Sequence, residues 1–301
     1  MKPVKPIKIS NDMKVKDLIK ELRGAGFGAK KIGIAVEIFD QMIKDKDCKV
    51  FLGLAGAMVP AGMKQIIIDM VNDGFIDVLV STGANLTHDL VEALGHHHYQ
   101  GSEFADDVEL NKKGIDRIYD VFMKNEVYQT LEKFINKNFE VLSKCTNVRE
   151  FLTKLGELAP GSSILNACFK KNIPIFCPGI SDSGIGLMIW NNISQGKKTD
   201  VNAFEDLKEI LDIVWQSKKT GFIYLGGGVP KNYIQQALQF GKDADYGIQI
   251  TMDRIETGGS SGAPLQEGIS WGKMKASGKF VTVSCDVTIA LPLIYGGVKK
   301  G

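Results

Sequence analysis

The sequence predicts an α/β protein with a doubly wound, mostly parallel sheet and helices on both faces. Two observations lead to this fold class. Short apolar runs alternate with longer amphipathic stretches along most of the 301 residues, and strands that alternate with helices form parallel sheets covered by those helices. Turns of glycine and small residues follow several of the apolar runs. Ligands of such folds gather at the carboxyl ends of the strands, so these turns are candidate binding sites.

The chain is expected to begin with helices over residues 14–23 and 30–44, the second with an apolar stripe of Ile34, Ile38 and Met42. Strands are expected at 50–54, 76–80, 173–178, 222–225, 246–251 and 280–285. Further helices are expected at 127–142, 165–171 and 204–216. Four more are expected with one end marked: one ends at Val71, one begins near Thr87, one runs through Trp190, and one begins at Val229. Residues 106–155 outside helix 127–142 form a mixed, charged connection.

Composition excludes several classes of function. The 37 basic and 35 acidic residues give a formal charge of +2. So small a net charge provides no overall positive electrostatic potential that would attract nucleic acid. No apolar run approaches the roughly 18 residues that a membrane-spanning helix needs, so we expect a cytoplasmic protein without a membrane partner. The five cysteines are odd in number and widely spaced, which is typical of reduced thiols inside a cell.

Three adjacent histidines, His96, His97 and His98, stand out by composition. Neighbouring residues of a regular element cannot all face one ion, and no zinc-type spacing of Asp, Glu or Cys follows them. We therefore expect loop residues of mixed exposure and no metal site. Whether they contact a ligand is left open.

The segment from Gly258 to Lys273 is the strongest candidate site. It brings an anion, Glu267, an indole, Trp271, and an amine, Lys273, within seven positions of a glycine- and serine-rich run. An aromatic face attracts a cation, and a carboxylate binds it by a charge-assisted hydrogen bond. A lysine kept from water can act as a nucleophile that forms Schiff bases. The alternative is a solvated lysine beside a packed tryptophan.

Two other strand ends carry candidate ligand-binding residues. The apolar run 222–225 ends in Gly226, Gly227 and Gly228 before a helix, and glycines let backbone N–H groups approach a phosphate at a helix N-terminus. Asp182 follows the run 173–178 among small residues. It can bind a ribose hydroxyl or a cation, or it can cap the next helix.

These motifs resemble those of the deoxyhypusine synthase family. The resemblance rests on Leu225-Gly-Gly-Gly-Val-Pro-Lys231, Ala244-Asp-Tyr246, Gly258 to Gly262, and Glu267-x-x-x-Trp271-Gly-Lys273, in the family's order and spacing. Residues 77–82 and 173–182 also match, so the likeness covers about Lys49 to Pro292. It implies a Rossmann-like, NAD-binding fold, with residues 1–45 as an N-terminal helical arm and 46–301 as a single catalytic domain.

The resemblance also implies an activity. Family members use NAD to oxidise spermidine, capture the aminobutyl group on a lysine as an imine, and pass it to a lysine of a translation factor. The matching catalytic residue is Lys273, with Glu267, Trp271, Gly227 and Gly258 in the substrate pocket. The residues that resemble cofactor contacts are Thr82, Asp182 and Asp286. Family members are homotetramers, so we expect the same assembly here.

Several positions depart from the family pattern. His88 stands where the family usually has a glutamate, and Ala55-Gly56-Ala57 replaces a more polar turn. Leu187 and Ser260 stand where the family usually has aspartates, and Asn232 stands where it has a histidine. A buried ammonium needs an anion to offset its desolvation, so these changes bear on the donor and the acceptor. Two alternatives follow, a homospermidine-type polyamine synthase with a small amine acceptor and a non-catalytic dinucleotide-binding sensor.

Overall fold

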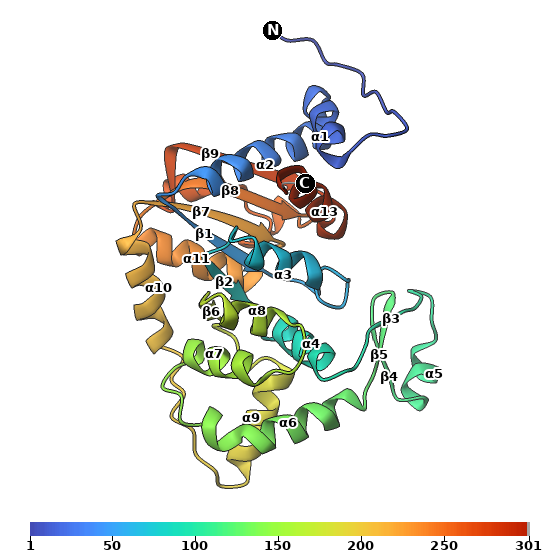
Figure 1. The fold of residues 1–301 in the computed structure, drawn as a ribbon, viewed down its shortest axis with the longest axis vertical. Helices are drawn as coiled ribbons and strands as arrows, with labels where there is room; N and C mark the ends of the chain where they lie inside the picture. Colours follow the sequence, from blue (N-terminus) through green and yellow to red (C-terminus); the bar gives the residue numbers. More distant parts are fainter. Residues whose placement is uncertain (300–301) are drawn as a thin grey trace. The chain divides into compact units, whose positions relative to one another are not determined.

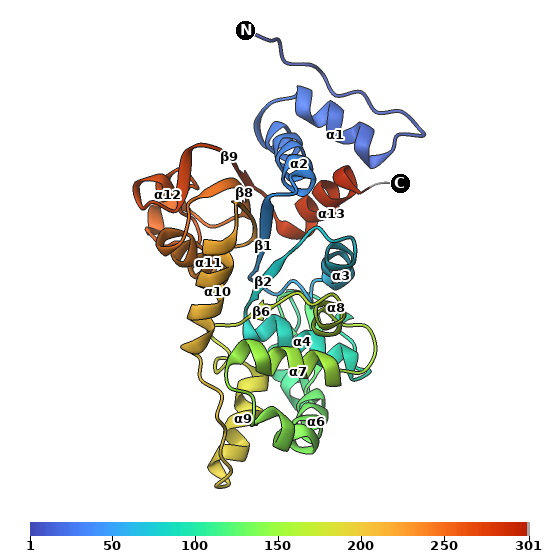
Figure 2. The same ribbon diagram turned by 60° about the vertical axis from the view of Figure 1, so that its left-hand side comes forward.

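The computed structural model describes residues 1–299, which divide into two compact units. The first contains Met1–Ala55, Phe75–Val78 and the described part of Glu209–Gly301, and the second contains Gly56–Gly74 and Leu79–Lys208. Figures 1 and 2 show the elements of both. Each unit is described by itself below.

The main sheet has the strand order β6-β2-β1-β7-β8-β9. Parallel pairing joins β1 to β7, β7 to β8, β8 to β9, and β2 to β6. This confirms the predicted mostly parallel α/β fold. The strands are β1 (Cys48–Leu54), β2 (Val78–Ser81), β6 (Ile175–Phe176), β7 (Lys219–Leu225), β8 (Ala244–Thr251) and β9 (Met274–Ser284).

In the first unit, helices cover both faces of strands β1, β7, β8 and β9 (Figure 2). Helices α2 (Phe27–Lys44) and α13 (Val287–Val298) pack on one face, and α1 (Val15–Gly24) packs on both of them. Helix α11 (Gly228–Phe240) packs on β1 from the other face. A Cβ on Gly297 would lie 3.0 Å from Val36, so the helices α13 and α2 approach closely. The domain boundary at residues 45 and 46 stays a prediction.

The second unit packs helices around β2 and β6. They are α3 (Lys64–Asn72), α4 (Gly83–Ala93), α6 (Val127–Leu142), α7 (Val148–Leu158), α8 (Ile164–Lys170) and α9 (Gly184–Ser194). The bounds of α6 are those expected from sequence. The expectation that a helix starts near Thr87 is wrong, because α4 begins at Gly83 and the Thr82 hydroxyl caps it by accepting from Asn85 N–H at 3.4 Å.

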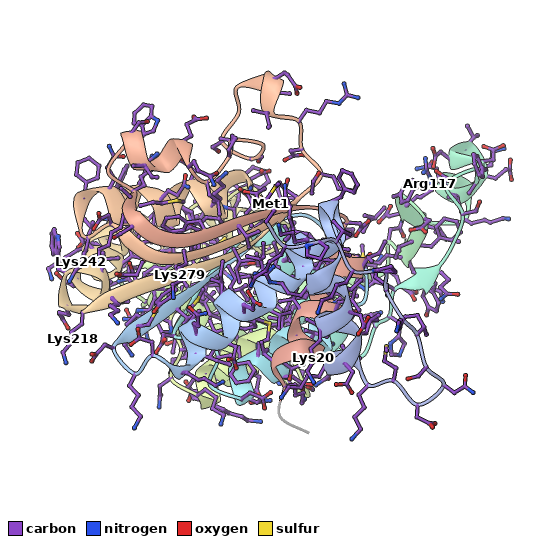
Figure 3. All side chains as sticks on the ribbon, turned by 90° about the horizontal axis from the view of Figure 1, so that it is seen from above. Met1, Lys20, Arg117, Lys218, Lys242 and Lys279 are labelled. Carbon is purple, nitrogen blue, oxygen red and sulfur yellow. The ribbon has the colours of Figure 1, made fainter. Side chains whose placement is uncertain are left out.

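A second, antiparallel sheet takes two of its three strands from segment 106–155, which was expected to be a charged connection. It has the order β3-β5-β4, formed by Tyr99–Gln100, Val121–Lys124 and Ile115–Ile118, with α5 (Asp107–Lys112) beside it. Arg117, labelled in Figure 3, donates two 2.6 Å hydrogen bonds to the Asp107 carboxylate and so ties β4 to α5. The remaining long helix, α10 (Glu205–Gln216), leads into β7.

The direction in which strands are added to the sheet reverses between β1 and β7. From β1 the chain adds β2 and β6 on one side, and later β7, β8 and β9 on the other. Open α/β sheets bind ligands outside the carboxyl ends of the strands at such a switch point. Ala55 N–H donates to Leu225 O at 3.0 Å there, so the end of β1 lies beside the glycine turn that follows β7. No helix within residues 1–299 is long and apolar enough to cross a membrane.

Candidate active site

Lys273 lies over the indole of Trp271, as the sequence predicts for a lysine beside an aromatic wall. Its Nζ is 4.9 Å from the ring centroid. The one-turn helix α12 (Glu267–Ser270) ends at Trp271, so Glu267 and Trp271 stand four residues apart on one helical face. The Lys273 amide donates to Gly268 O at 2.8 Å and fixes the turn into β9. Lys273 is half-buried and Trp271 is 56% exposed, so the indole is not part of the core.

A second lysine, Lys231, lies buried beneath this segment and was not singled out from the sequence. It is 1% exposed, and its Nζ donates to Gln249 Oε1 at 3.0 Å and to Ala263 O at 2.8 Å. Burial lowers the pKa of Lys231 to about 8, Glu267 opposes that shift, and the charge of Lys273 adds to it. The two lysines and Glu267 therefore lie within reach of each other's fields.

The Gln249 side chain connects the glycine turn to the candidate segment. Its Nε2 donates to Ser261 O at 2.7 Å and to Gly226 O at 3.3 Å. Gly228 N–H donates to the Ser261 hydroxyl at 2.6 Å. A Cβ on Gly227 would lie 2.5 Å from Ser261 Cα, so only glycine allows the two loops to approach this closely. Gly258, at φ +70°, turns the chain into the same loop.

Thr82 and Asp182 come together in the second unit, at the N-termini of α4 and α9. A Cβ on Gly83, next to Thr82, would lie 2.5 Å from Ser183 Cβ. The cap of α9 is Ser183, whose hydroxyl accepts from Gly186 N–H at 3.0 Å. The capping alternative for Asp182 is therefore wrong, and its exposed carboxylate stands beside two helix N-termini. Such termini attract anions and donate hydrogen bonds.

Asp286 has a structural role as well as a predicted ligand role. Its Oδ1 accepts from Thr288 N–H and from the Thr288 hydroxyl, both at 2.7 Å, and so caps α13. Within residues 1–299, Oδ2 has no hydrogen-bond partner. A ligand hydroxyl can use that oxygen without disturbing the cap.

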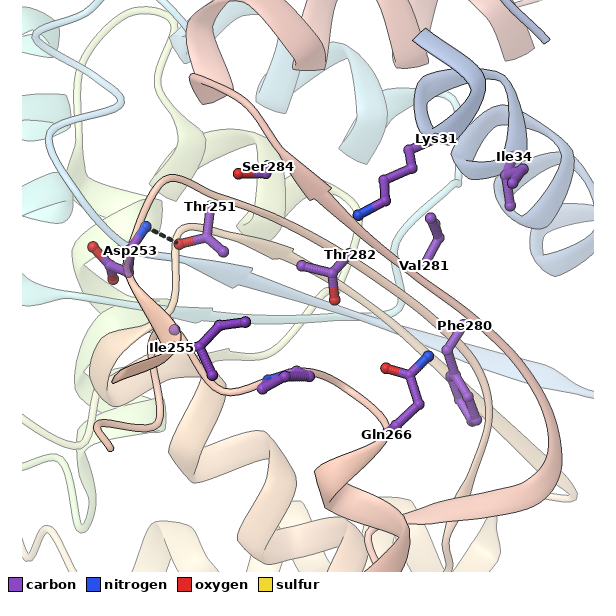
Figure 4. Close-up of a pocket in the computed structure, with 12 residues that line it drawn as sticks. Lys31, Ile34, Thr251, Asp253, Ile255, Gln266, Phe280, Val281, Thr282 and Ser284 are labelled. Atoms are coloured by element: carbon purple, nitrogen blue, oxygen red, sulfur yellow. Dashed lines mark hydrogen bonds between the residues drawn. The ribbon is translucent and has the colours of Figure 1, made fainter. Parts of the chain in front are cut away.

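A cavity of about 350 Å³ opens at the carboxyl ends of β8 and β9 in the first unit (Figure 4). It combines hydroxyls, a carboxylate and an ammonium with apolar walls. The Thr282 hydroxyl is buried and has no partner within residues 1–299. A buried polar atom of this kind is usually satisfied by water or a ligand. The lining includes Lys31, Thr251, Asp253, Gln266, Phe280, Thr282 and Ser284.

Comparisons with known proteins agree with this arrangement. A sequence model of the family "Deoxyhypusine synthase" matches residues 17–298. The chain belongs to the deoxyhypusine synthase family. It is 47% identical over 300 residues to a Methanosarcina mazei protein named "Probable deoxyhypusine synthase 1", covering 99% of this chain and 94% of that one. A similarly named Archaeoglobus fulgidus protein is 42% identical over 95% of this chain and 94% of that one.

Solved structures show the same fold. A structure from Entamoeba histolytica that carries the name of a deoxyhypusine synthase has a TM-score of 0.65 at 22% identity, with 94% of this chain and 92% of that chain covered. The cyanobacterial arginine dihydrolase ArgZ has a TM-score of 0.51 at 13% identity over 91% of this chain and 33% of that one. At such identities the likeness concerns the fold alone.

The structure groups the predicted site residues into two sets. Thr82 and Asp182 belong to the second unit, and the others to the first: Gly227, Gly258, Glu267, Trp271, Lys273 and Asp286. No group of three or more His, Cys, Asp or Glu side chains within the described part of the chain could hold a metal ion.

Proposed function

We propose that this protein is an NAD-dependent aminobutyltransferase that works through an imine on Lys273. The observation that carries the proposal is the Lys273 amine 4.9 Å from the centre of the Trp271 ring, in a segment whose Glu267 and Lys273 both act on the charge of the buried Lys231. Family membership supports a transferase acting on a polyamine of the spermidine type. The glycine turn at the N-terminus of α11 supports a phosphate-binding site.

The residues predicted to bind NAD belong to two units. In the first unit, the glycine turn at Gly227 suits a phosphate, and the free Oδ2 of Asp286 suits a hydroxyl. In the second unit, Thr82 and Asp182 stand at helix N-termini, which suit a phosphate, and the Asp182 carboxylate suits a ribose hydroxyl. When bound, NAD would supply the acceptor for a hydride from the amine carbon and the donor for its return. This chain's own residues bind, orient and capture the amine.

The Lys273 role follows from amine chemistry. Glu267 binds one ammonium of the substrate, and the Trp271 face attracts a cationic nitrogen of the substrate. The neutral Lys273 amine attacks the carbon of the oxidised substrate's imine, and the C–N bond to the departing diamine breaks. The diamine nitrogen takes a proton, and the aminobutyl group remains as an imine on Lys273. An acceptor amine then displaces Lys273 by the same exchange.

Trapping with borohydride tests this chemistry. The full chain, NAD and labelled spermidine should yield a reduced adduct on Lys273, located by peptide mass spectrometry. Lys273→Arg keeps the charge but forms no imine, so it should give no adduct while NAD binding stays within about twofold. Trapping at another residue, or none with any polyamine, would refute the proposal and leave the dinucleotide sensor as the alternative.

The acceptor is tested separately. Leu187 stands where the family usually has an aspartate, and its apolar side chain supplies no anion for a substrate ammonium. Wild-type protein with NAD and labelled spermidine is given putrescine in one tube and a hypusine-type translation factor in another. Label in the factor supports protein modification. Label only in homospermidine supports the small-amine acceptor.

The exposed apolar face of α9 supports self-association, and we propose the homotetramer of the family. Leu187, Trp190 and Ile193 are 57%, 60% and 42% exposed on one stripe. Apolar patches of this kind usually mark protein interfaces. Light scattering should give four times the chain mass of 33.0 kDa, and a monomer would refute the assembly.

A further inference from the structure

The cavity at the carboxyl ends of β8 and β9 has no role in the reaction proposed above. It lies within the first unit, where helix α2, strand β9 and the loop after β8 contribute its walls (Figure 4). Its volume of about 350 Å³ lies within the range of about 300–1,000 Å³ that small-molecule sites occupy. The lining contains none of the residues proposed for the polyamine or for NAD. The cavity is therefore a candidate for a ligand of its own.

The polar side chains of the lining are available to such a ligand. The Lys31 ammonium, the Asp253 carboxylate and the Gln266 amide make no hydrogen bond or ion pair within residues 1–299. Figure 4 shows Lys31 extending from α2 toward β9, the strand that carries Thr282. The Thr282 hydroxyl is buried and has no partner in the same range of residues. An unpaired buried hydroxyl costs free energy, so a ligand that bonds to Thr282 removes that cost.

Apolar side chains form the rest of the walls. They are Ile34 from α2, Ile255 and Pro264 from the loop, and Phe280 and Val281 from β9. Apolar surface that leaves water for such walls favours binding. The cavity therefore suits a molecule that has an apolar body and polar ends.

The two charged groups of the lining have opposite signs. Lys31 repels a polyamine, and Asp253 repels the pyrophosphate of a dinucleotide. A ligand with one carboxylate and one ammonium can instead make a charge-assisted hydrogen bond to each of these groups. The charges therefore favour a zwitterion over either of the ligands proposed for the Lys273 site.

One wall of the cavity is also part of the loop beside the glycine turn. The Ser261 hydroxyl accepts from the glycine turn at 2.6 Å, and Ala263 O accepts from Lys231 at 2.8 Å. The residues that alternate with them, Gly262 and Pro264, line the cavity. A ligand in the cavity therefore contacts one side of the loop whose other side is bonded to Lys231.

We propose that this cavity binds a small zwitterion with an apolar body, the chemistry of a free amino acid with an aliphatic or aromatic side chain. The ligand's carboxylate pairs with Lys31 and accepts a hydrogen bond from the Thr282 hydroxyl, and its ammonium pairs with Asp253. Its side chain lies against Ile255 and Phe280. Binding makes and breaks no covalent bond, so the site is separate from the proposed aminobutyl transfer and does not depend on it.

Calorimetric titration of the full chain tests the ligand class with probes of one carbon skeleton. L-Leucine carries both charges, isopentylamine carries only the ammonium, and 4-methylpentanoate carries only the carboxylate. Leucine should bind, and each single-charge probe should bind about tenfold more weakly, because one charge-assisted contact is lost. The proposal is overturned if neither leucine nor phenylalanine binds at about 10 mM, or if a single-charge probe binds more tightly than leucine.

Variants of the lining test which groups hold the probe. Lys31→Met and Asp253→Asn should each weaken leucine binding about tenfold, whereas Lys30→Met changes an exposed lysine outside the lining and should bind normally. Thr282→Val removes the unpaired hydroxyl at similar shape, so the Tm without leucine should not fall, and leucine should bind about threefold more weakly. Normal leucine binding by both Lys31→Met and Asp253→Asn would overturn the proposal.

Hydrogen exchange of the full chain locates the bound probe without relying on any activity. Leucine should slow the exchange of amides in loop 253–266, because that loop forms a wall of the cavity. Lys30→Met should show the same protection, and Lys31→Met should show less at the same leucine concentration. Protection confined to the second unit would overturn the proposal, whether or not the chain transfers an aminobutyl group.

Discussion

Replacing Lys231 by methionine should remove a pH dependence of stability that this one residue produces. Burial lowers the pKa of Lys231 to about 8 in the folded chain, against about 10.4 for an unfolded lysine. Between these values the unfolded chain binds more protons, so the stability of the wild type rises as pH rises through that window. At about 1.4 kcal/mol per pKa unit, the rise is about 3 kcal/mol.

Urea unfolding of wild type and Lys231→Met at pH 7.5, 8.5, 9.5 and 10.5 measures this difference. The variant's stability should fall relative to the wild type by about 3 kcal/mol from the lowest to the highest pH. Lys46→Met, at an exposed lysine, controls for loss of a charge and should run parallel to the wild type. Parallel curves for Lys231→Met as well would show that Lys231 is not desolvated, and the reasoning would fail.

Three further changes test other contacts. Asp89→Asn replaces a carboxylate that accepts from two α8 amides, at 2.9 and 3.0 Å, by an amide whose single oxygen accepts in place of two. Burial also raises the pKa of Asp89 to about 7, so wild type should lose stability relative to that variant as pH rises from about 4 to 7; a constant difference would contradict this. Gly227→Ala should weaken NAD binding at least tenfold in calorimetry, because the new Cβ would lie 2.5 Å from Ser261 Cα. Gly259→Ala is the control and should bind NAD normally, because its new Cβ would have no atom nearer than 3.6 Å. Trp271→Leu should raise KM for the polyamine two- to fivefold, because it loses about 0.5–1 kcal/mol of cation–π attraction. The Tm should stay unchanged, since the ring is 56% exposed. A large fall in Tm would show that the ring is structural.

The strands and the glycine turns could be predicted because their signal is local. An apolar run such as 222–225 buries itself whatever surrounds it, and β7 extends it only by Lys219–Gly221. The small β3-β5-β4 sheet could not be predicted in the same way. All four residues of β4 are half-buried, so its pattern lacks the alternation by which a strand is recognised.

The buried members of the site were harder to find than the exposed ones. Lys231 stands three residues before Ile234 and seven before Leu238, which are 0% and 1% exposed. A lysine at a core position of an amphipathic helix is the signal that could have identified it. The 2.7 Å hydrogen bond between His98 and Glu92 joins a loop to a helix, and no spacing along the sequence predicts it.

The charge of Lys231 depends on Glu267, which is the first of the groups that favour its charged form, ahead of Asp253. If Glu267 binds a substrate ammonium as proposed, that ammonium would compete for the same carboxylate and add a second positive charge near the lysine. Substrate binding would then shift Lys231 toward its neutral form. A neutral amine keeps two N–H donors, enough for Gln249 and Ala263 O, so the loop retains its attachment while the local positive charge falls. The buried lysine can thus hold the loop in either protonation state. Its positive charge opposes an approaching substrate ammonium and falls once that ammonium is bound.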